Sequence, residues 1–282
     1  MPVRVRVPAT TANLGPGFDC LGAAVRLHNT LTLLDEPAPW PDAFMSEAAE
    51  AFFRAAGRKR RSWKVLIEGD VPRARGLGSS VTVRLGLLLA LNEREKRPLP
   101  PEKILELTIQ LEGHPDNAVP AFHGGFAACG PKGHTRIDVE PTLKFVVAIP
   151  DFEVETKAAR AVLPATLPLR DAILNLQCTA ALVGAFVDKN YPALRGNFQD
   201  TLHQPYRAPL IHGCQAVMDA ALDAGALGAF ISGSGSAMMA LTLHSEHQIA
   251  LAMGAAFRGA GVAEPVTHVL TADNDGAVVL DP

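Results

Sequence analysis

The sequence has little cysteine and no long apolar run. Its four cysteines lie far apart and form no C-x-x-C pair, which argues against a zinc knuckle or a disulfide framework and favours reduced thiols. Apolar runs such as Leu85 to Leu91 are too short to cross a bilayer. The first residues alternate apolar and basic side chains, unlike the apolar stretch of a signal peptide. We therefore expect a cytoplasmic protein that does not bind membranes.

The sequence also lacks a strong excess of one charge. It has 26 Lys and Arg against 29 Asp and Glu, and the only basic run, at 58–61, is typical of a solvated turn. A nucleic-acid binder usually has a basic face or a strongly positive balance, so we expect no nucleic-acid partner. At 282 residues the chain is long enough for one large domain or two smaller ones.

Predicted strands and helices occur in runs without strict alternation, which favours an α+β chain over a doubly wound parallel sheet. Apolar spacing and turn residues predict strands at 3–8, 27–34, 64–68, 126–129, 135–139 and 144–149, and helices at 43–56, 79–95, 102–111, 170–188 and 209–224. A loop rich in Gly, Pro and Asn, at 8–22, separates the first two predicted strands and is the first candidate site.

A second glycine-rich loop, at 72–80, leads directly into a predicted helix. Such a loop can turn several N–H donors and the positive end of the helix dipole towards a phosphate. Gly76 and Gly78 allow close approach, and the two serines that follow offer hydroxyls to a phosphate or a magnesium ion. No Lys follows as in a Walker loop, and Val81 stands where a dinucleotide fingerprint needs glycine. The loop by itself is equally typical of a simple helix cap.

Three glycine-rich segments together resemble the motifs of the GHMP kinases in order and spacing. Residues 8–22 resemble the N-terminal motif, residues 72–80 the second motif, and residues 231–237 the C-terminal motif, although Ser236 replaces the usual proline. A further segment, Glu112-Gly-His-Pro-Asp-Asn117, is similar to the form found in members that act on L-homoserine. The resemblance covers nearly the whole chain.

This resemblance implies a two-domain fold with the active site between the domains. Residues 1–141 would form an ATP-binding domain like the second domain of ribosomal protein S5, and residues 142–282 a ferredoxin-like domain. The implied reaction is ATP- and Mg²⁺-dependent phosphorylation of the side-chain hydroxyl of L-homoserine to O-phospho-L-homoserine, a step of threonine biosynthesis. A homodimer is expected by analogy. The alternatives are a mevalonate-type member and a non-catalytic binding protein of the same fold.

The resemblance also implies roles for the residues of the reaction centre. Mevalonate-type members have a carboxylate general base at the position of Asn117, and an amide cannot usefully accept the hydroxyl proton. Asn117 is therefore expected to orient the hydroxyl, while its neighbour Asp116 points elsewhere. Glu106, eleven residues before Asn117, is the implied magnesium ligand together with Ser80.

For the zwitterionic substrate, Asn13 and Asp19 match the ammonium side, Arg160 and Arg207 match the carboxylate side, and His114 matches a further contact. The implied nucleotide contacts are Pro72, Arg73, Ala74, Arg75, Gly76, Leu77, Gly78, Ser79, Ser80, Gly233 and Gly235. Taken singly, these arginines are typical of the surface, an aspartate of a turn, and a lone histidine of a packed loop. Only their joint occurrence in family order favours a site.

Overall fold

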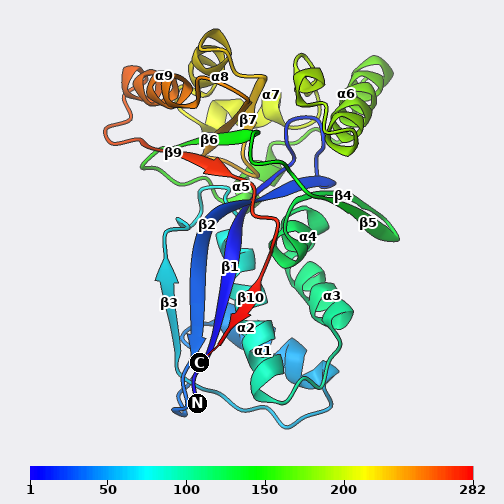
Figure 1. Cartoon of the computed structure of the whole chain (residues 1–282), viewed down its shortest axis with the longest axis vertical. Helices are drawn as coiled ribbons and strands as arrows, with labels where there is room; N and C mark the ends of the chain where they lie inside the picture. Colours follow the sequence, from blue (N-terminus) through cyan, green and yellow to red (C-terminus); the bar gives the residue numbers. More distant parts are fainter. Residues whose placement is uncertain (282) are drawn as a thin grey trace.

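The structure is a computed structural model, and it describes residues 1–281. Within this range the chain forms two antiparallel sheets that lie one above the other in Figure 1. The six-stranded sheet has the order β10-β1-β2-β4-β5, with β3 paired to β2, and the four-stranded sheet has the order β7-β8-β6-β9. The α+β class expected from the sequence is confirmed. None of the helices in this range is both long and apolar enough to cross a membrane.

The strands are β1 (Val3–Ala12), β2 (Leu21–Leu33), β3 (Val65–Gly69), β4 (Phe126–Gly130), β5 (Gly133–Ile137), β6 (Lys144–Ile149), β7 (Gly228–Ile231), β8 (Met238–Thr242), β9 (Val266–Thr271) and β10 (Val278–Leu280). The α-helices are α1 (Ala43–Ala55), α2 (Ser79–Arg94), α3 (Pro101–Glu112), α4 (Pro115–His123), α5 (Thr156–Ala161), α6 (Leu169–Val187), α7 (Gln204–Arg207), α8 (Cys214–Asp223) and α9 (Glu246–Gly259).

The first strand shows how the two halves of the molecule meet. Along the first residues of β1, Val5 and Val7 are buried while Arg4 is exposed, as expected for a strand with one covered face. From Val7 to Ala12 every residue is buried. The far end of β1 is therefore covered on both faces, and the loop that follows it emerges between the two halves.

Two glycine-containing loops join the halves at the same place. A Cβ on Gly76, whose φ is +74°, would lie 2.0 Å from the carbonyl oxygen of Ser232. The Ser232 hydroxyl donates to the Gly76 carbonyl at 2.8 Å, and the Ala237 N–H donates to the Arg75 carbonyl at 3.1 Å. Only glycine at position 76 permits this backbone contact.

The structure corrects several predicted elements. Helix α4 is not among the predicted elements. Gly113 and Pro115, which follow the predicted helix at 102–111, are typical of a helix end, but Pro115 stands at the first turn of a new helix. Helix α5 was also not predicted. Helix α8 begins at Cys214 and not at 209, since residues 208–210 form a short 3₁₀ turn. The first loop is shorter than expected, because β1 extends to Ala12 and β2 begins at Leu21.

The expected domain boundary at 141/142 falls between β5 and β6, which belong to different sheets. The chain then returns to its first sheet, because β10 pairs with β1 through the register Arg4↔Leu280. Both ends of the described chain thus lie at the same end of the first sheet (Figure 1).

The contact between the loops gives a first testable prediction. We expect Gly76→Ala to lower the free energy of unfolding by about 3 kcal/mol or more, because a positive φ is combined with a backbone clash. The matched control is Gly57→Ala, since Gly57 also has a positive φ but no other residue lies within 4 Å of the place that a methyl group would take there. The control substitution should lower the free energy of unfolding by about 1 kcal/mol. Chemical denaturation measures both, and equal losses would show that the loop contact is not tight.

Candidate active site

A cavity of about 390 Å³ lies where the two sheets meet. Its walls come from the loop after β1, the loop and first turns of α2, the junction of α3 and α4, helices α5 and α7, and the loop after β7. The predicted residues in its wall are Asn13, Asp19, Ala74, Arg75, Gly76, Gly78, Ser79, Ser80, His114, Asn117, Arg160, Arg207 and Gly233. Residues as distant as Asn13 and Gly233, which are 220 positions apart, are thus brought together.

The residues that line the cavity differ in part from the predicted site residues. Among the predicted residues, those outside the wall are Pro72, Arg73, Leu77, Glu106 and Gly235. Residues in the wall that the sequence did not assign to the site are Ala12, Phe18, Arg84, Glu112, Asp116, Thr156 and Ser234. Asp116 had been expected to point elsewhere, and this expectation was wrong.

The glycine loop enters α2 in a form suited to an anion. Gly78 has a φ of +66° and is the N-cap, so the two serines are the first helical residues and not side-chain caps. Their hydroxyls are therefore available for other contacts, and Ser80 Oγ donates to Glu112 Oε2 at 2.7 Å. The helix N-terminus adds the positive end of its dipole to this corner of the cavity.

Arg84, one turn after Ser80, fixes the other oxygen of Glu112. Its Nη1 donates to Glu112 Oε1 at 3.0 Å, its Nη2 donates to Glu47 Oε2 at 2.8 Å, and its guanidinium lies 4.0 Å from the centre of the Phe44 ring. The arginine thus ties α1, α2 and α3 together. It leaves Glu112 Oε2 as the oxygen turned towards Ser80.

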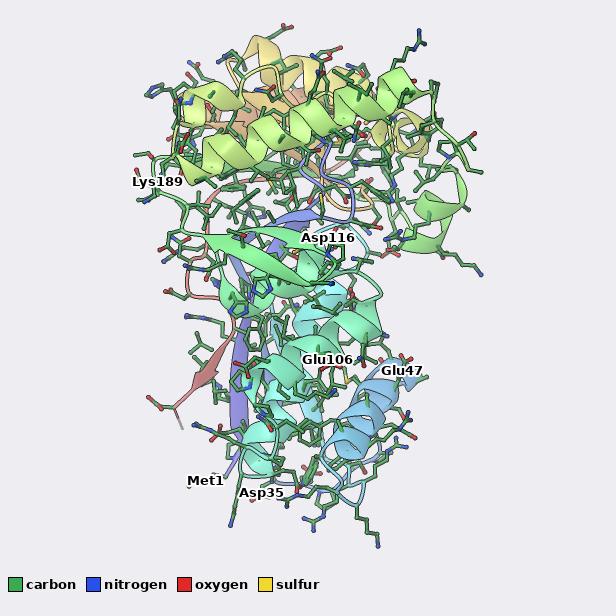
Figure 2. The ribbon with its side chains drawn as sticks, turned by 90° about the vertical axis from the view of Figure 1, so that its right-hand side faces the viewer. Met1, Asp35, Glu47, Glu106, Asp116 and Lys189 are labelled. Carbon is green, nitrogen blue, oxygen red and sulfur yellow. The ribbon has the colours of Figure 1, made fainter. Side chains whose placement is uncertain are left out.

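The prediction of Glu106 as the carboxylate beside Ser80 is corrected by this geometry. Glu106 accepts hydrogen bonds from Lys103 Nζ at 2.8 Å and Gln110 Nε2 at 2.9 Å on the exposed side of α3. In Figure 2 it lies along the helix at a distance from the labelled Asp116. The carboxylate that reaches Ser80 is Glu112, at the last residue of α3.

Asn117 is held by a neighbour from the first sheet. Its Oδ1 accepts a hydrogen bond from Thr10 Oγ1 at 2.7 Å, and its Nδ2 lies 3.5 Å from Asp116 Oδ1. Because the amide oxygen already accepts from Thr10 while the N–H₂ group has only the 3.5 Å contact, the N–H₂ group is the donor that Asn117 can offer to a ligand.

The acidic side of the cavity contains three close groups. One ligand atom each of Asp19, His114 and Asp116 lies within 4.8 Å of the others. His114 Nδ1 is 2.5 Å from Asp116 Oδ1. Burial alone would lower the pKa of His114, but the hydrogen bond and the charge of Asp116 outweigh it and raise this pKa. The cluster therefore carries an excess of negative charge.

Two arginines of the cavity wall lie near an aromatic ring. The guanidinium carbons of Arg160 and Arg207 lie 5.4 Å and 5.0 Å from the centre of the Phe18 ring. Arg160 makes two hydrogen bonds to Asp19, of 3.0 Å and 2.8 Å. This ion pair joins α5 to the loop after β1 across the cavity.

Arg207 has a different environment, because it is 2% exposed and its donors reach carbonyl oxygens. Its Nε donates to the Ala159 carbonyl and its Nη1 to the Gly233 carbonyl, each at 3.0 Å. No carboxylate of residues 1–281 forms an ion pair with it. Burial, followed by repulsion from Arg160, lowers the pKa of Arg207 to about 10, which leaves it charged at neutral pH.

A shell of contacts behind the cavity fixes the loop between β1 and β2. Asn13, with a φ of +71°, donates through Nδ2 to the Gly233 carbonyl and accepts from the Asp19 N–H. His203, which is fully buried, has its Nε2 2.7 Å from the Gly15 carbonyl. These supporting contacts join residues distant in the sequence, and no local pattern indicated them.

The chain is similar to known proteins over its whole length. Residues 43–125 match the GHMP kinases N terminal domain, and residues 170–259 match the GHMP kinases C terminal domain. A homoserine kinase of Moorella thermoacetica is 39% identical over 99% of this chain and 100% of the relative, and one of Trichormus variabilis is 41% identical over 98% of each.

Solved structures agree with these relatives. The crystal structure of a homoserine kinase from Cytophaga hutchinsonii has a TM-score of 0.89 and 27% identity, covering 99% of this chain and 97% of that one. A mevalonate kinase structure has a TM-score of 0.72 at 13% identity over 96% and 99% of the two chains, which shows a shared fold alone.

The His114–Asp116 contact gives a second prediction, on pH dependence. Since the pKa of His114 is raised in the folded state, the stability from this contact is complete below about pH 6.5, the ordinary pKa of an unfolded histidine. It is lost as the pH rises through the raised pKa of folded His114. In Asp116→Asn, where burial and Arg160 remain, we expect the pKa of His114 to fall below 6.5. NMR titration of its ring protons measures this, and an unchanged pKa would contradict the assignment.

Proposed function

Because the chain belongs to the homoserine kinases of the GHMP kinase family, we propose that its cavity transfers the γ-phosphoryl group of ATP to the side-chain hydroxyl of L-homoserine. The product is O-phospho-L-homoserine. The cavity supports each part of this proposal separately: a charged pocket for the amino acid, a glycine loop for the phosphates, and an amide between them.

The arrangement of charge is the observation that carries the proposal. Asp19 and Asp116 line the same cavity as Arg160 and Arg207. Homoserine carries an ammonium and a carboxylate, so each end has a partner of opposite charge, and an arginine fork suits a carboxylate. Arg207 is the strongest single indication, because its partners are two carbonyls and the His203 ring, and a buried cation without an ion-pair partner is normally compensated by an anion.

The Asp19–Arg160 ion pair takes a defined place in this proposal. Both side chains are partly exposed to the cavity, and each is a partner that one end of the zwitterion requires. We propose that the incoming amino acid exchanges this internal pair for two new ones, between its ammonium and Asp19 and between its carboxylate and Arg160. A ligand with only one charge leaves either Asp19 or Arg160 without compensation.

The phosphate side fits ATP and a magnesium ion. The loop around Gly76 and Gly78 and the N-terminus of α2 offer N–H donors to the phosphates. Hydroxyl and carboxylate oxygens are the donors that Mg²⁺ prefers, and Ser80 Oγ and Glu112 Oε2 lie 2.7 Å apart. When bound, the ion neutralises charge on the phosphates during transfer. Arg84 keeps the Glu112 carboxylate in the orientation that this role requires.

The hydroxyl would be positioned by Asn117. Asn117 Oδ1 accepts a hydrogen bond from Thr10, so Asn117 Nδ2 would donate to the hydroxyl oxygen of the substrate. That hydrogen bond would direct a lone pair of the hydroxyl oxygen at the phosphoryl group. An amide takes no proton, so the hydroxyl proton leaves through the phosphate or water. Catalysis by this chain then rests on positioning and electrostatic stabilisation, as is general for phosphoryl transfer.

The corrected carboxylate gives a third prediction. We expect Glu112→Gln to reduce kcat at least about a hundredfold, the loss of roughly 2.7 kcal/mol of transition-state stabilisation, and to raise the magnesium concentration needed for half-maximal rate. Glu106→Gln, six residues earlier on the same helix, is the matched control and should leave both values nearly unchanged. Steady-state kinetics over a magnesium series decides between the two carboxylates. The opposite pattern would restore Glu106 as the ligand.

A substrate panel tests the function itself and is the fourth prediction. In a coupled ATPase assay with L-homoserine, L-serine, mevalonate and galactose, we expect L-homoserine to have the highest kcat/KM. Mevalonate lacks the ammonium and would leave the charge of Asp19 uncompensated, so its kcat/KM should be at least about a hundredfold lower than that of L-homoserine. L-Serine has both charges but a shorter arm, and a misplacement of about 1 Å can cost a hundredfold. A preference for mevalonate would favour the mevalonate-type alternative. If no compound were phosphorylated, the result would favour a non-catalytic binding protein.

A further inference from the structure

His203, at the start of α7, is a fully buried histidine with a partner at each ring nitrogen. Its Nε2 lies 2.7 Å from the carbonyl oxygen of Gly15 and 3.4 Å from Asp200 Oδ2. Its Nδ1 lies 3.4 Å from Arg207 Nη1. The two nitrogens therefore face groups of different kinds, oxygen acceptors at Nε2 and a guanidinium donor at Nδ1.

These neighbours decide which ring nitrogen carries the proton. A carbonyl oxygen and an ionised carboxylate can only accept, so Nε2 carries a hydrogen and donates it. A guanidinium can only donate, so Nδ1 keeps its lone pair and accepts from Arg207. Burial lowers the pKa of His203 and outweighs the opposing charge of Asp200, which agrees with a ring that is neutral near pH 7.

The donors of Arg207 can then be followed nitrogen by nitrogen. An arginine has one N–H on Nε and two on each Nη. Its Nε–H donates to the Ala159 carbonyl, and Nη1 donates to the Gly233 carbonyl and to His203 Nδ1. Nη2 has no hydrogen-bond partner within residues 1–281, and it is not completely enclosed. Because Arg207 lines the cavity, Nη2 is the nitrogen that is open to a ligand.

We propose that His203 is a positioning residue for substrate binding: as the neutral Nε2–H tautomer it accepts a hydrogen bond from Arg207 Nη1, and so holds Nη2 towards the carboxylate of the amino acid. This rests on the proposed function, because it takes the carboxylate of L-homoserine as the partner of Arg207. A protonated ring would instead turn an N–H and a like charge towards the guanidinium. A side chain without an acceptor would leave a buried donor of Arg207 unpaired.

The same ring connects Arg207 to the loop that carries Asp19. While Nδ1 accepts from Arg207, Nε2 donates to Gly15 in the loop after β1, and the ring centre lies 5.2 Å from that of Phe18 in the same loop. An imidazole is rigid, so the separation of its two nitrogens cannot change. His203 therefore couples the arginine proposed for the carboxylate to the loop proposed for the ammonium.

The fifth prediction separates the two contacts of the ring. His203→Gln has an N–H₂ group at the place of Nε2 and can still donate to Gly15, but it has no acceptor at the place of Nδ1. His203→Asn has its amide oxygen at the place of Nδ1 and can still accept from Arg207, but it does not reach Gly15. We expect the KM for L-homoserine to rise at least about tenfold in His203→Gln and clearly less in His203→Asn.

Steady-state kinetics with L-homoserine and ATP varied in turn measures this difference. The KM for ATP and kcat should change little in either variant, because a carboxylate contact made before and during the reaction is uniform binding. A larger rise in His203→Asn would show that the ring acts through Gly15 and would overturn the proposal. Unchanged KM values in both variants would also contradict it. Failure of either variant to fold, seen by circular dichroism, would make His203 a structural residue and has the same consequence.

The tautomer is measured on the native chain without substrate. In a chain labelled with ¹⁵N-histidine, long-range ¹H–¹⁵N NMR correlations distinguish a ring nitrogen that carries a proton from one that has a lone pair. The signals of His203 are those absent from the spectrum of His203→Asn. We expect a protonated Nε2 and an unprotonated Nδ1 near neutral pH, and a protonated Nδ1 overturns the proposal. This readout needs neither ATP nor homoserine, so its failure is distinguishable from a failure of the proposed function, which the substrate panel tests.

Discussion

The contact between two backbones, at Gly76 and at Ser232, is the constraint on which the rest of the site depends. It brings a loop of the six-stranded sheet within hydrogen-bonding distance of a loop of the four-stranded sheet. The N-terminal end of α2 and the buried Arg207 therefore face one cavity, although they belong to different halves of the chain. A side chain at position 76 would separate these halves, because its first carbon would meet a carbonyl oxygen that cannot move independently of β7.

Given that contact, the wall of the cavity combines side chains of both charges. Asp19 and Arg160 form an ion pair, whereas Arg207 lies 5.0 Å from the centre of the Phe18 ring and has two carbonyls and the His203 ring as its partners. Buried charges that lack compensation are costly, so each such residue restricts which ligand can bind. Under the proposed function, a ligand with one positive and one negative end satisfies the arginines and the aspartates together, and this would be the physical basis for selecting an amino acid over an uncharged alcohol or a sugar.

Local patterns predicted the elements that local physics determines. The helix at 79–95 and the glycine loop before it follow from apolar spacing and backbone freedom, and the structure places them within a residue of the prediction. The carboxylate beside Ser80 could not be predicted in this way. Glu106 and Glu112 both stand on α3, but six residues turn a helix by about 240°, so they point to different sides. Choosing between them required the turn at Gly113 and the unpredicted helix α4, which together bring the end of α3 to Ser80.

Helix α6 supports the cavity although none of its residues lines the wall. From the inner face of this helix, Asn175 Nδ2 and Thr179 Oγ1 donate to the Pro16 carbonyl at 2.8 Å and 3.0 Å, and so hold the loop that carries Asp19. Asp19 in turn accepts both hydrogen bonds from Arg160. The position of this ion pair therefore depends on a helix outside the cavity, through two hydrogen bonds to a single carbonyl oxygen.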